Sequence, residues 1–188
     1  DVTDDPIDDT PLSLSQLLEI GQTANNAMLS QEPNGNWLVE GSPTDGALLA
    51  VAGKAGMPAY QLAHRIDEIP FSSSHKDMAS LDPAACGTRL HIKGAAEKIL
   101  GFCDTILTDE GVVPLTQELR DQIRSVQEEY AARALRVVAA AMKPMDPTTT
   151  SVERSDAEAG CIFVGLWGLM DPPRPEAAVA VAAARKAG

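Results

Sequence analysis

The apolar segments in the middle of this chain are joined by connections too short to hold helices. The segments IDEIPF (66–71) and KDMASL (76–81) are separated only by the polar tetrapeptide SSSH, and RLHIKG (89–94) follows after another short stretch. Parallel neighbours in a sheet need crossover connections of roughly a dozen residues or more, whereas antiparallel neighbours need only a turn. The sequence therefore predicts an α+β fold, with a mainly antiparallel β-sheet flanked by helices.

Apolar residues at helical spacing predict the flanking helices. The face of the first helix is expected to comprise Leu14, Leu17, Leu18, Ala24 and Met28. A second helix is expected after Ser42, which is a candidate N-cap, and Asp45 three residues later would complete a capping box. The longest helix is expected from Thr116 to Ala134, with its buried face formed by Leu119, Ile123, Val126 and Tyr130. Further strands are expected in NWLVEG (36–41), LRVVAAAM (135–142) and CIFVGLWGLMD (161–171).

The stretch LHIKGAAEKIL (90–100) predicts a strand that runs directly into a helix. Leu90 and Ile92 would face one side of the sheet, and His91 and Lys93 the other, before the spacing becomes helical after Gly94. This arrangement would leave a lysine and an open backbone position beside the start of a helix. A strand-end lysine of this kind is expected to be solvated until a ligand arrives.

Composition limits the class of partner. Hydrophobic residues make up 44% of the 188 residues. The chain has 15 basic and 27 acidic side chains, which give it a formal net charge of -12. This charge disfavours non-specific binding to nucleic acid or to an anionic membrane surface. Three widely spaced cysteines without a CxxC pair indicate reduced thiols rather than disulfides or a zinc site. No apolar run approaches the roughly 20 residues that a membrane-spanning helix needs, so we expect a piece that is not inserted in a membrane. We also expect this piece to be a monomer.

Several common catalytic and metal-binding patterns are missing. GALLAVAGK (46–54) superficially resembles a phosphate loop, but its glycines are wrongly spaced and Ala55 stands where Ser or Thr is required. His64, His75 and His91 lack the spacing of metal ligands, so solvated or core histidines are expected and no metal site is predicted. There is no GxSxG nucleophile elbow. The sequence therefore does not support a complete catalytic apparatus.

Five separated segments resemble one protein family. They are EGSPTDGALL, EIPFSSSHKDM, LHIKGAAEKIL, ALRVVAAAMK and GLMDPPRPEA. In order and approximate interval they resemble the motifs of the nucleotide-binding domain of P-type cation-transporting ATPases. The motif sequences are most similar to those of the subgroup that includes calcium pumps. Each match is short, but five in the same order make chance improbable. The resemblance covers nearly the whole chain and implies the fold of that domain.

The resemblance implies an ATP site. The residues that correspond to its contacts are Asp45, Phe71, Lys76, Met78, Lys93, Gly94, Arg136 and Val138. In the family the adenine stacks on an aromatic ring, here Phe71, and lies against the lysine of the KGA segment, here Lys93. Lys76, Lys93 and Arg136 would have to converge to offset the negative charge of the phosphates. Gly94 would let the ligand approach the backbone, and the following helix would offer N–H groups.

Several of these residues also have ordinary structural explanations. From the residues alone, a core phenylalanine is the favoured interpretation of Phe71, and the capping box is the favoured interpretation of Asp45. The family has a glutamate at the position of Asp45, and the aspartate side chain is one methylene shorter than that glutamate. Ser73 and Ala96 replace an arginine and a proline of the family pattern, and the first replacement should weaken binding by removing a phosphate contact.

The family pattern also predicts the domain organisation. Residues 1–170 would form the nucleotide-binding domain, with 1–11 resembling a linker, and 171–188 would form the hinge and the start of the phosphorylation domain. Asp171 and Arg174 lie in the hinge motif DPPR, on the possible phosphate side. The start at Asp1 and the end at Gly188 within an apolar helical run indicate an excised piece of a longer chain.

The resemblance implies a function for the parent protein as well. The sequence holds no DKTGT, TGD or GDGxND segment, so this piece is expected to bind ATP but to be catalytically inactive alone. The parent would use ATP with Mg²⁺ to transport a cation, calcium by subgroup, and this piece would lie at the cytoplasmic face of a membrane. Its partners would be the phosphorylation and actuator domains of the same chain. The alternative from another class is a non-catalytic acidic interaction domain.

Overall fold

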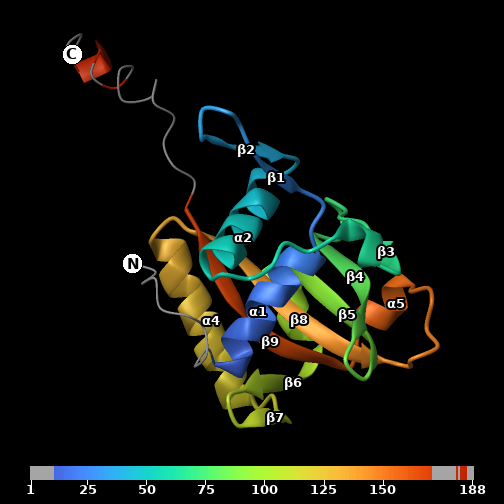
Figure 1. The fold of residues 1–188 in the computed structure, drawn as a ribbon. Helices are drawn as coiled ribbons and strands as arrows, with labels where there is room; N and C mark the ends of the chain where they lie inside the picture. The colour runs from blue at the N-terminus through green and yellow to red at the C-terminus, as the bar shows by residue number, and fades with distance from the viewer. Residues whose placement is uncertain (1–10, 171–180, 182, 186–188) are drawn as a thin grey trace.

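A seven-stranded sheet lies between two groups of helices in the computed structural model, which describes residues 11–170, 181 and 183–185 (Figure 1). In spatial order the strands are β3 (Asp67–Ile69), β4 (Asp77–Ala84), β5 (Gly87–Gly94), β8 (Arg136–Met145), β9 (Cys161–Leu169), β6 (Cys103–Thr108) and β7 (Gly111–Pro114). The pairs are antiparallel except that β6 and β9 run parallel. The predicted α+β fold with a mainly antiparallel sheet is confirmed.

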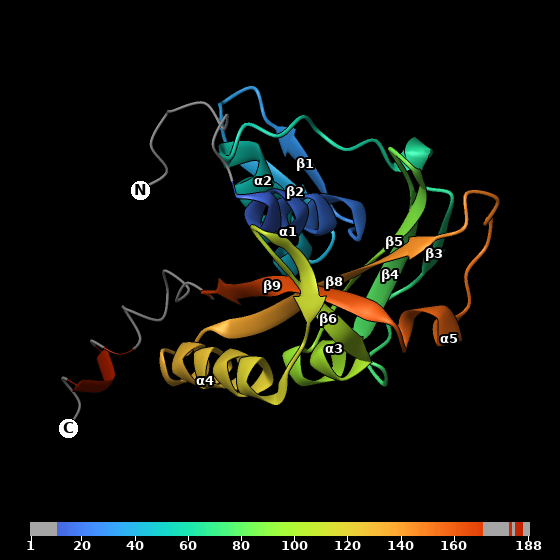
Figure 2. The ribbon, with the colours of Figure 1, turned by 90° about the horizontal axis from the view of Figure 1, so that it is seen from below.

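The helices cover both faces of this sheet. Figure 2 shows α1 (Leu12–Thr23) and α2 (Pro43–Lys54) on one face, and α3 (Ala96–Phe102) and α4 (Gln117–Ala132) on the other. The elements outside these layers are the ribbon of β1 (Met28–Gln31) and β2 (Trp37–Glu40), the short 3-10 helix η1 (Leu62–His64) and α5 (Arg154–Ala157). Within the described ranges, no helix is long and apolar enough to cross a membrane.

Strand alternation divides the core into two clusters, one on each face. Leu90 and Ile92 of β5 pack in the cluster that contains Ile99 and Leu100 of α3. The opposite face of the sheet contributes Met78 and Ala140 to the cluster beneath α1 and α2. The predicted change of facing along β5 is therefore confirmed, and it directs the intervening polar residues toward the α1 and α2 layer.

His91 is a core histidine, which is one of the two states expected for it. Its ring is 1% exposed, and Nδ1 lies 2.8 Å from the hydroxyl of Thr23 on α1 and 3.1 Å from a carboxylate oxygen of Asp82 on β4. A buried imidazole needs such polar partners to offset its desolvation. His64 and His75 are exposed.

Some helix boundaries and faces differ from the expectation. The first helix ends at Thr23, so Ala24 is its C-cap and Met28 lies in β1 with 54% exposure. Leu14 is also exposed, because the chain packs α1 through its second half, around Leu18 and Ile20. The helical spacing alone did not reveal this end, although the two asparagines at 25 and 26 are residues that often follow a helix.

The long helix α4 packs more loosely than its periodicity suggested. Leu119 and Ile123 are partly buried against the core, but Val126 is exposed and the helix has no fully buried residue. Arg120 attaches the helix to the end of α3 by donating to the carbonyls of Leu100 and Cys103, at 2.7 and 2.6 Å. Polar contacts therefore supplement the narrow apolar face.

The sequence analysis missed the strands β1, β6 and β7. The segment CDTILTDEGVVP (103–114) forms the β6–β7 hairpin, whose partners Thr108 and Gly111 flank its tight turn. Gly111 has φ of +121°, a conformation that favours glycine. The DEG turn between two β-branched runs was a usable hairpin signal. The proposed linker 1–11 except Pro11, and the hinge residues Asp171 and Arg174, lie outside the described residues.

Candidate functional site

A pocket of about 440 Å³ opens between α2 and the ends of β4, β5 and β8. Its lining comprises Ser42, Thr44, Asp45, Phe71, Lys76, Met78, Lys93, Gly94, Ala95, Arg136, Val137 and Val138. All eight residues of the predicted ATP set lie in this lining, although they come from four separate segments of the chain. The fold thus brings together in one cavity the residues that the sequence motifs singled out.

Phe71 stands on the open side of this pocket. Strand β3 ends at Ile69, and after Pro70 the chain leaves the sheet, so the ring has no place in either core cluster and is 61% exposed. The interpretation as a core phenylalanine is therefore wrong. An exposed aromatic ring next to apolar lining from Met78 and Val138 provides a flat surface on which a planar ligand can stack.

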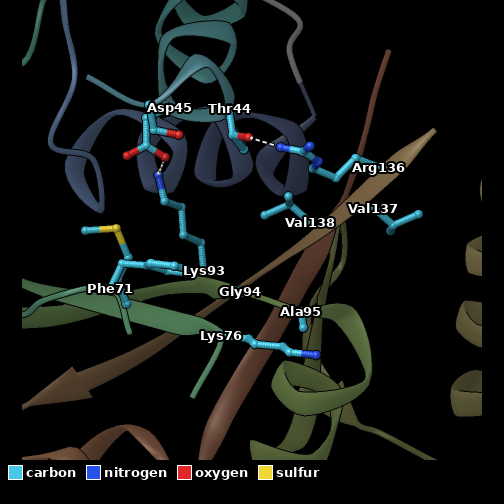
Figure 3. A pocket seen from close by; sticks show the side chains of 12 residues that line it. Thr44, Asp45, Phe71, Lys76, Lys93, Gly94, Ala95, Arg136, Val137 and Val138 are labelled. Atoms are coloured by element: carbon cyan, nitrogen blue, oxygen red, sulfur yellow. Dashed lines mark hydrogen bonds and ion pairs between the residues drawn. The ribbon is translucent and has the colours of Figure 1, made fainter. Parts of the chain in front are cut away.

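Lys93 and Asp45 form an ion pair across the pocket (Figure 3). Lys93 projects from β5 toward α2, where its ammonium donates to Asp45 Oδ1 at 2.6 Å. The lysine is 5% exposed, and this burial lowers its pKa although the Asp45 carboxylate acts in the opposite direction. The expectation of a solvated lysine is wrong, because α2 covers the end of β5.

This pairing also replaces the predicted capping box. Ser42 precedes α2 in an extended conformation, but its side chain makes no capping hydrogen bond, and Asp45 points to Lys93 instead. Gly46, the next residue, lies against β2, where an added Cβ would stand 2.4 Å from Val39 Cγ1. This close approach fixes the first turn of α2 and therefore the position of Asp45 over the pocket.

The three predicted phosphate-binding cations line the pocket but point in different directions. Figure 3 shows Arg136 directed toward α2, where it donates to the Thr44 hydroxyl at 2.8 Å, while Lys76 is directed toward the start of α3. Lys93 points at Asp45. The expected convergence of Lys76, Lys93 and Arg136 is thus not present in this structure, because two of them make contacts with α2.

Gly94 has a packing role that the sequence did not reveal. A Cβ added there would lie 2.6 Å from the Lys76 carbonyl oxygen and 2.9 Å from Asp77 Cα. The Ala95 N–H donates to the same Lys76 carbonyl at 2.9 Å. The absent side chain therefore lets β4 and β5 approach closely at the pocket floor, and the first backbone N–H after Gly94 is already used by the protein.

Four lining residues were missed by the sequence reasoning. They are Ser42, Thr44, Ala95 and Val137. Each is within a quoted motif and adjacent in sequence to a predicted residue or separated from it by a few positions, so the motif boundaries carried the signal. Thr44 is the most informative of them, because its hydroxyl holds Arg136 at the pocket rim.

The comparisons with known proteins identify the family. The family model described as P-type ATPase, cytoplasmic domain N, matches residues 13–176. The chain is a P-type ATPase N domain. This N domain is 39% identical over 185 residues to the cation-transporting ATPase pma1 of Synechocystis. The aligned region covers 97% of the chain and 20% of that protein.

Two further relatives agree with this assignment. The N domain is 33% identical to calcium-transporting ATPase 1 of Lactococcus lactis, over 92% of the chain and 19% of that protein. It is 34% identical to the probable cation-transporting ATPase F of Mycobacterium tuberculosis, over 96% of the chain and 21% of that protein. The chain therefore spans about a fifth of the length of these relatives.

Proposed function

We propose that this N domain binds ATP in the pocket between α2 and the ends of β4, β5 and β8. The observation that carries the proposal is the assembly of all eight motif residues in one lining, from four separate segments. A pocket of about 440 Å³ with an exposed aromatic wall suits a nucleoside, since ligand sites are usually apolar clefts with a few placed polar groups.

The adenine would occupy the apolar part of the pocket. Phe71 offers a free ring face, and Met78 and Val138 supply the adjoining apolar surface. Stacking of a base on an aromatic side chain contributes roughly 1–3 kcal/mol and tolerates different bases. The Asp45–Lys93 pair lies beyond this surface and would present a carboxylate and an ammonium to the ring edge.

The phosphates would be bound by cations at the pocket rim. The chain carries a formal net charge of -12, so a polyanion requires local positive charge to bind. Lys76 and Arg136 are both exposed at the lining and can reorient toward a ligand. Lys93 would assist only by sharing its proton donors between Asp45 and the nucleotide, because the ion pair already engages it.

In the parent protein, ATP held here would deliver its terminal phosphate to an aspartate of the phosphorylation domain. The parent would be an ATP hydrolase that uses Mg²⁺ and couples this covalent step to cation transport across a membrane, with calcium as the proposed ion. This N domain would lie at the cytoplasmic face, with the actuator domain as a further partner. Residues 1–170 would be the nucleotide-binding unit, and 171–188, with Asp171 and Arg174, the hinge to the phosphorylation domain.

The isolated N domain should bind ATP without hydrolysing it or becoming phosphorylated. The reason is that the 188 residues contain no DKTGT segment to supply the acceptor aspartate. Incubation with ATP labelled in the terminal phosphate, followed by acid precipitation, measures both reactions. Stoichiometric acid-stable phosphate on the protein would contradict the proposal.

ATP, ADP and AMP should bind within about tenfold of one another, a spread of roughly 1.4 kcal/mol. Stacking on Phe71 is common to all three, whereas Lys93 is already paired with Asp45, Arg136 already donates to Thr44 and Lys76 is exposed to water, so additional phosphates should contribute little. Isothermal titration calorimetry with and without Mg²⁺ measures the spread. Binding of ATP that is tight only with Mg²⁺, together with silent AMP, would indicate a phosphate-centred site instead.

The alternative function is that of a non-catalytic acidic interaction domain. Titration with ATP while NMR chemical shifts are followed separates the two. Shifts localised around Phe71 and Lys93 support the nucleotide site, whereas no perturbation at millimolar ATP would favour the interaction domain.

A further inference from the structure

The turn of residues 72–76 joins two walls of the pocket. Phe71 immediately precedes the turn and Lys76 ends it, so the conformation of the turn determines where both side chains stand. Lys76 has φ of +60°, in the left-handed region that residues with a side chain adopt rarely, and its N–H donates to the Ser72 carbonyl at 2.6 Å. Such a backbone conformation persists only where the surrounding contacts impose it.

Lys98 and Asp77 hold this backbone conformation from the face of the sheet that α3 covers. The ammonium of Lys98, on α3, donates to the His75 carbonyl at 2.7 Å and lies 3.0 Å from Asp77 Oδ1. Arg154 of α5 donates to the other carboxylate oxygen of Asp77 at 2.7 Å. The contacts therefore secure the residues before and after Lys76 and tie them to two helices.

Asp77 does not face the pocket. Side chains alternate along β4, so Asp77 shares the face of Ala79 and Leu81, which pack in the cluster with α3, while Met78 faces the pocket from the opposite side. Asp77 is fully buried, whereas the side chains of Lys98 and Arg154 are 29% and 26% exposed. A carboxylate in this position can influence a ligand only through the backbone that it holds.

Net stabilisation is a weak explanation for such a buried charge. Desolvation offsets much of the attraction within a buried ion pair, so a buried pair is poor evidence for stability. Its more informative consequence is conformational, because Lys98 can lie 3.0 Å from one oxygen of Asp77 and Arg154 2.7 Å from the other only when the start of β4 stands in one place.

We propose that Asp77 and Lys98 are positioning residues for the nucleotide pocket. They hold the 72–76 turn in the conformation that places Phe71 and Lys76 at the lining, without touching the ligand. This inference rests on the proposed ATP site, because it assigns the two residues a role in forming that site.

The test is the affinity of Lys98→Met for AMP and ATP, measured by calorimetry. The substitution keeps the aliphatic stem and removes both the hydrogen bond to the His75 carbonyl and the ion pair with Asp77. The dissociation constants for both nucleotides should rise about fivefold or more, since misplacement of Phe71 forfeits part of the stacking. Lys98→Arg, which can donate to the His75 carbonyl and keeps a positive charge beside Asp77, should restore most of the affinity.

Arg120→Met is the matched control. Arg120 also donates to backbone carbonyls near α3, but it does so at Leu100 and Cys103, at the opposite end of the helix from the 72–76 turn. It should lower the melting temperature and leave both dissociation constants unchanged. A merely structural role for Lys98 would give the same pattern in Lys98→Met, and that result would overturn the inference.

Asp77→Asn provides a second test that keeps the shape of the buried side chain. It should weaken AMP and ATP binding in the same direction as Lys98→Met, and parent-like affinity in both variants would overturn the positioning role. Failure of the two proposals can be distinguished. If the unsubstituted domain binds neither nucleotide, the proposed ATP site itself is wrong. If the unsubstituted domain and both variants bind equally well, only the roles of Asp77 and Lys98 are rejected.

Discussion

Replacement of Phe71 by alanine is expected to weaken ATP binding by about five- to a hundred-fold, which corresponds to the loss of roughly 1–3 kcal/mol of stacking. The ring is 61% exposed and lies outside both core clusters, so its removal leaves no cavity. The melting temperature should therefore stay within about 2 °C of the parent, because exposed substitutions usually change stability by less than about 0.5 kcal/mol. Calorimetry and thermal denaturation measure the two effects separately.

Phe163→Ala is the matched control for this prediction. Phe163 is 2% exposed in β9, and truncation of a core phenylalanine costs roughly 3–5 kcal/mol. A loss of about 6–20 °C in melting temperature is expected for a domain of this size. Phe71→Trp should retain binding, since it preserves a ring face. If Phe71→Ala behaves like Phe163→Ala in the absence of ligand, the ring is a core residue after all; if Phe71→Ala binds ATP like the parent, the stacking site is elsewhere.

Local patterns were sufficient to predict the sheet but not its full extent. Alternation in RLHIKG correctly predicted β5, and the short SSSH connection correctly predicted that β3 and β4 are antiparallel neighbours, because both signals act over a few adjacent residues. The hairpin of β6 and β7 lies at the edge of the sheet, and β6 pairs in parallel with β9 from far along the chain. The sequence predicted β9 as a strand, but nothing in either segment indicates that β6 and β9 pair with each other.

The membership of the pocket could be predicted, whereas its internal contacts could not. Motif letters identified Asp45, Lys93 and Arg136, and the structure places all three in one lining. The letters contained no information on pairing, so the ion pair between Asp45 and Lys93 and the hydrogen bond from Arg136 to Thr44 emerged only from the placement of α2 over the sheet. A charged residue in a motif can therefore be engaged by the protein before any ligand arrives.

Gly94 lines the pocket as expected, but it also has a packing role that the motif did not indicate. The motif suggested that Gly94 leaves room for a ligand, but its missing Cβ faces the backbone of Lys76 and Asp77 on the neighbouring strand. The two explanations make different predictions. Room for a ligand concerns affinity alone, whereas close packing of strands concerns the stability of the free domain as well.

Gly94→Ala is therefore expected to destabilise the N domain even without nucleotide. The new Cβ would stand 2.6 Å from the Lys76 carbonyl oxygen and 2.8 Å from Asp77 Cβ, and a backbone atom cannot move aside as the end of a flexible side chain can. Overpacking of this kind costs typically about 1–3 kcal/mol. Thermal denaturation should show a melting temperature lower by about 2–12 °C. ATP binding should weaken too, because a shift of β4 would move Met78 and the preceding Lys76, which both line the pocket.

Gly53→Ala supplies the control, since a Cβ added at that position in α2 meets nothing within 4 Å. Alanine is favoured over glycine inside a helix by roughly 0.5–1 kcal/mol, so this variant should be slightly more stable than the parent and bind ATP equally well. Gly94→Ala with a parent-like melting temperature but lost ATP binding would instead support the ligand-approach role. The opposing signs expected for two substitutions of the same chemistry make the packing explanation testable without knowledge of the ligand.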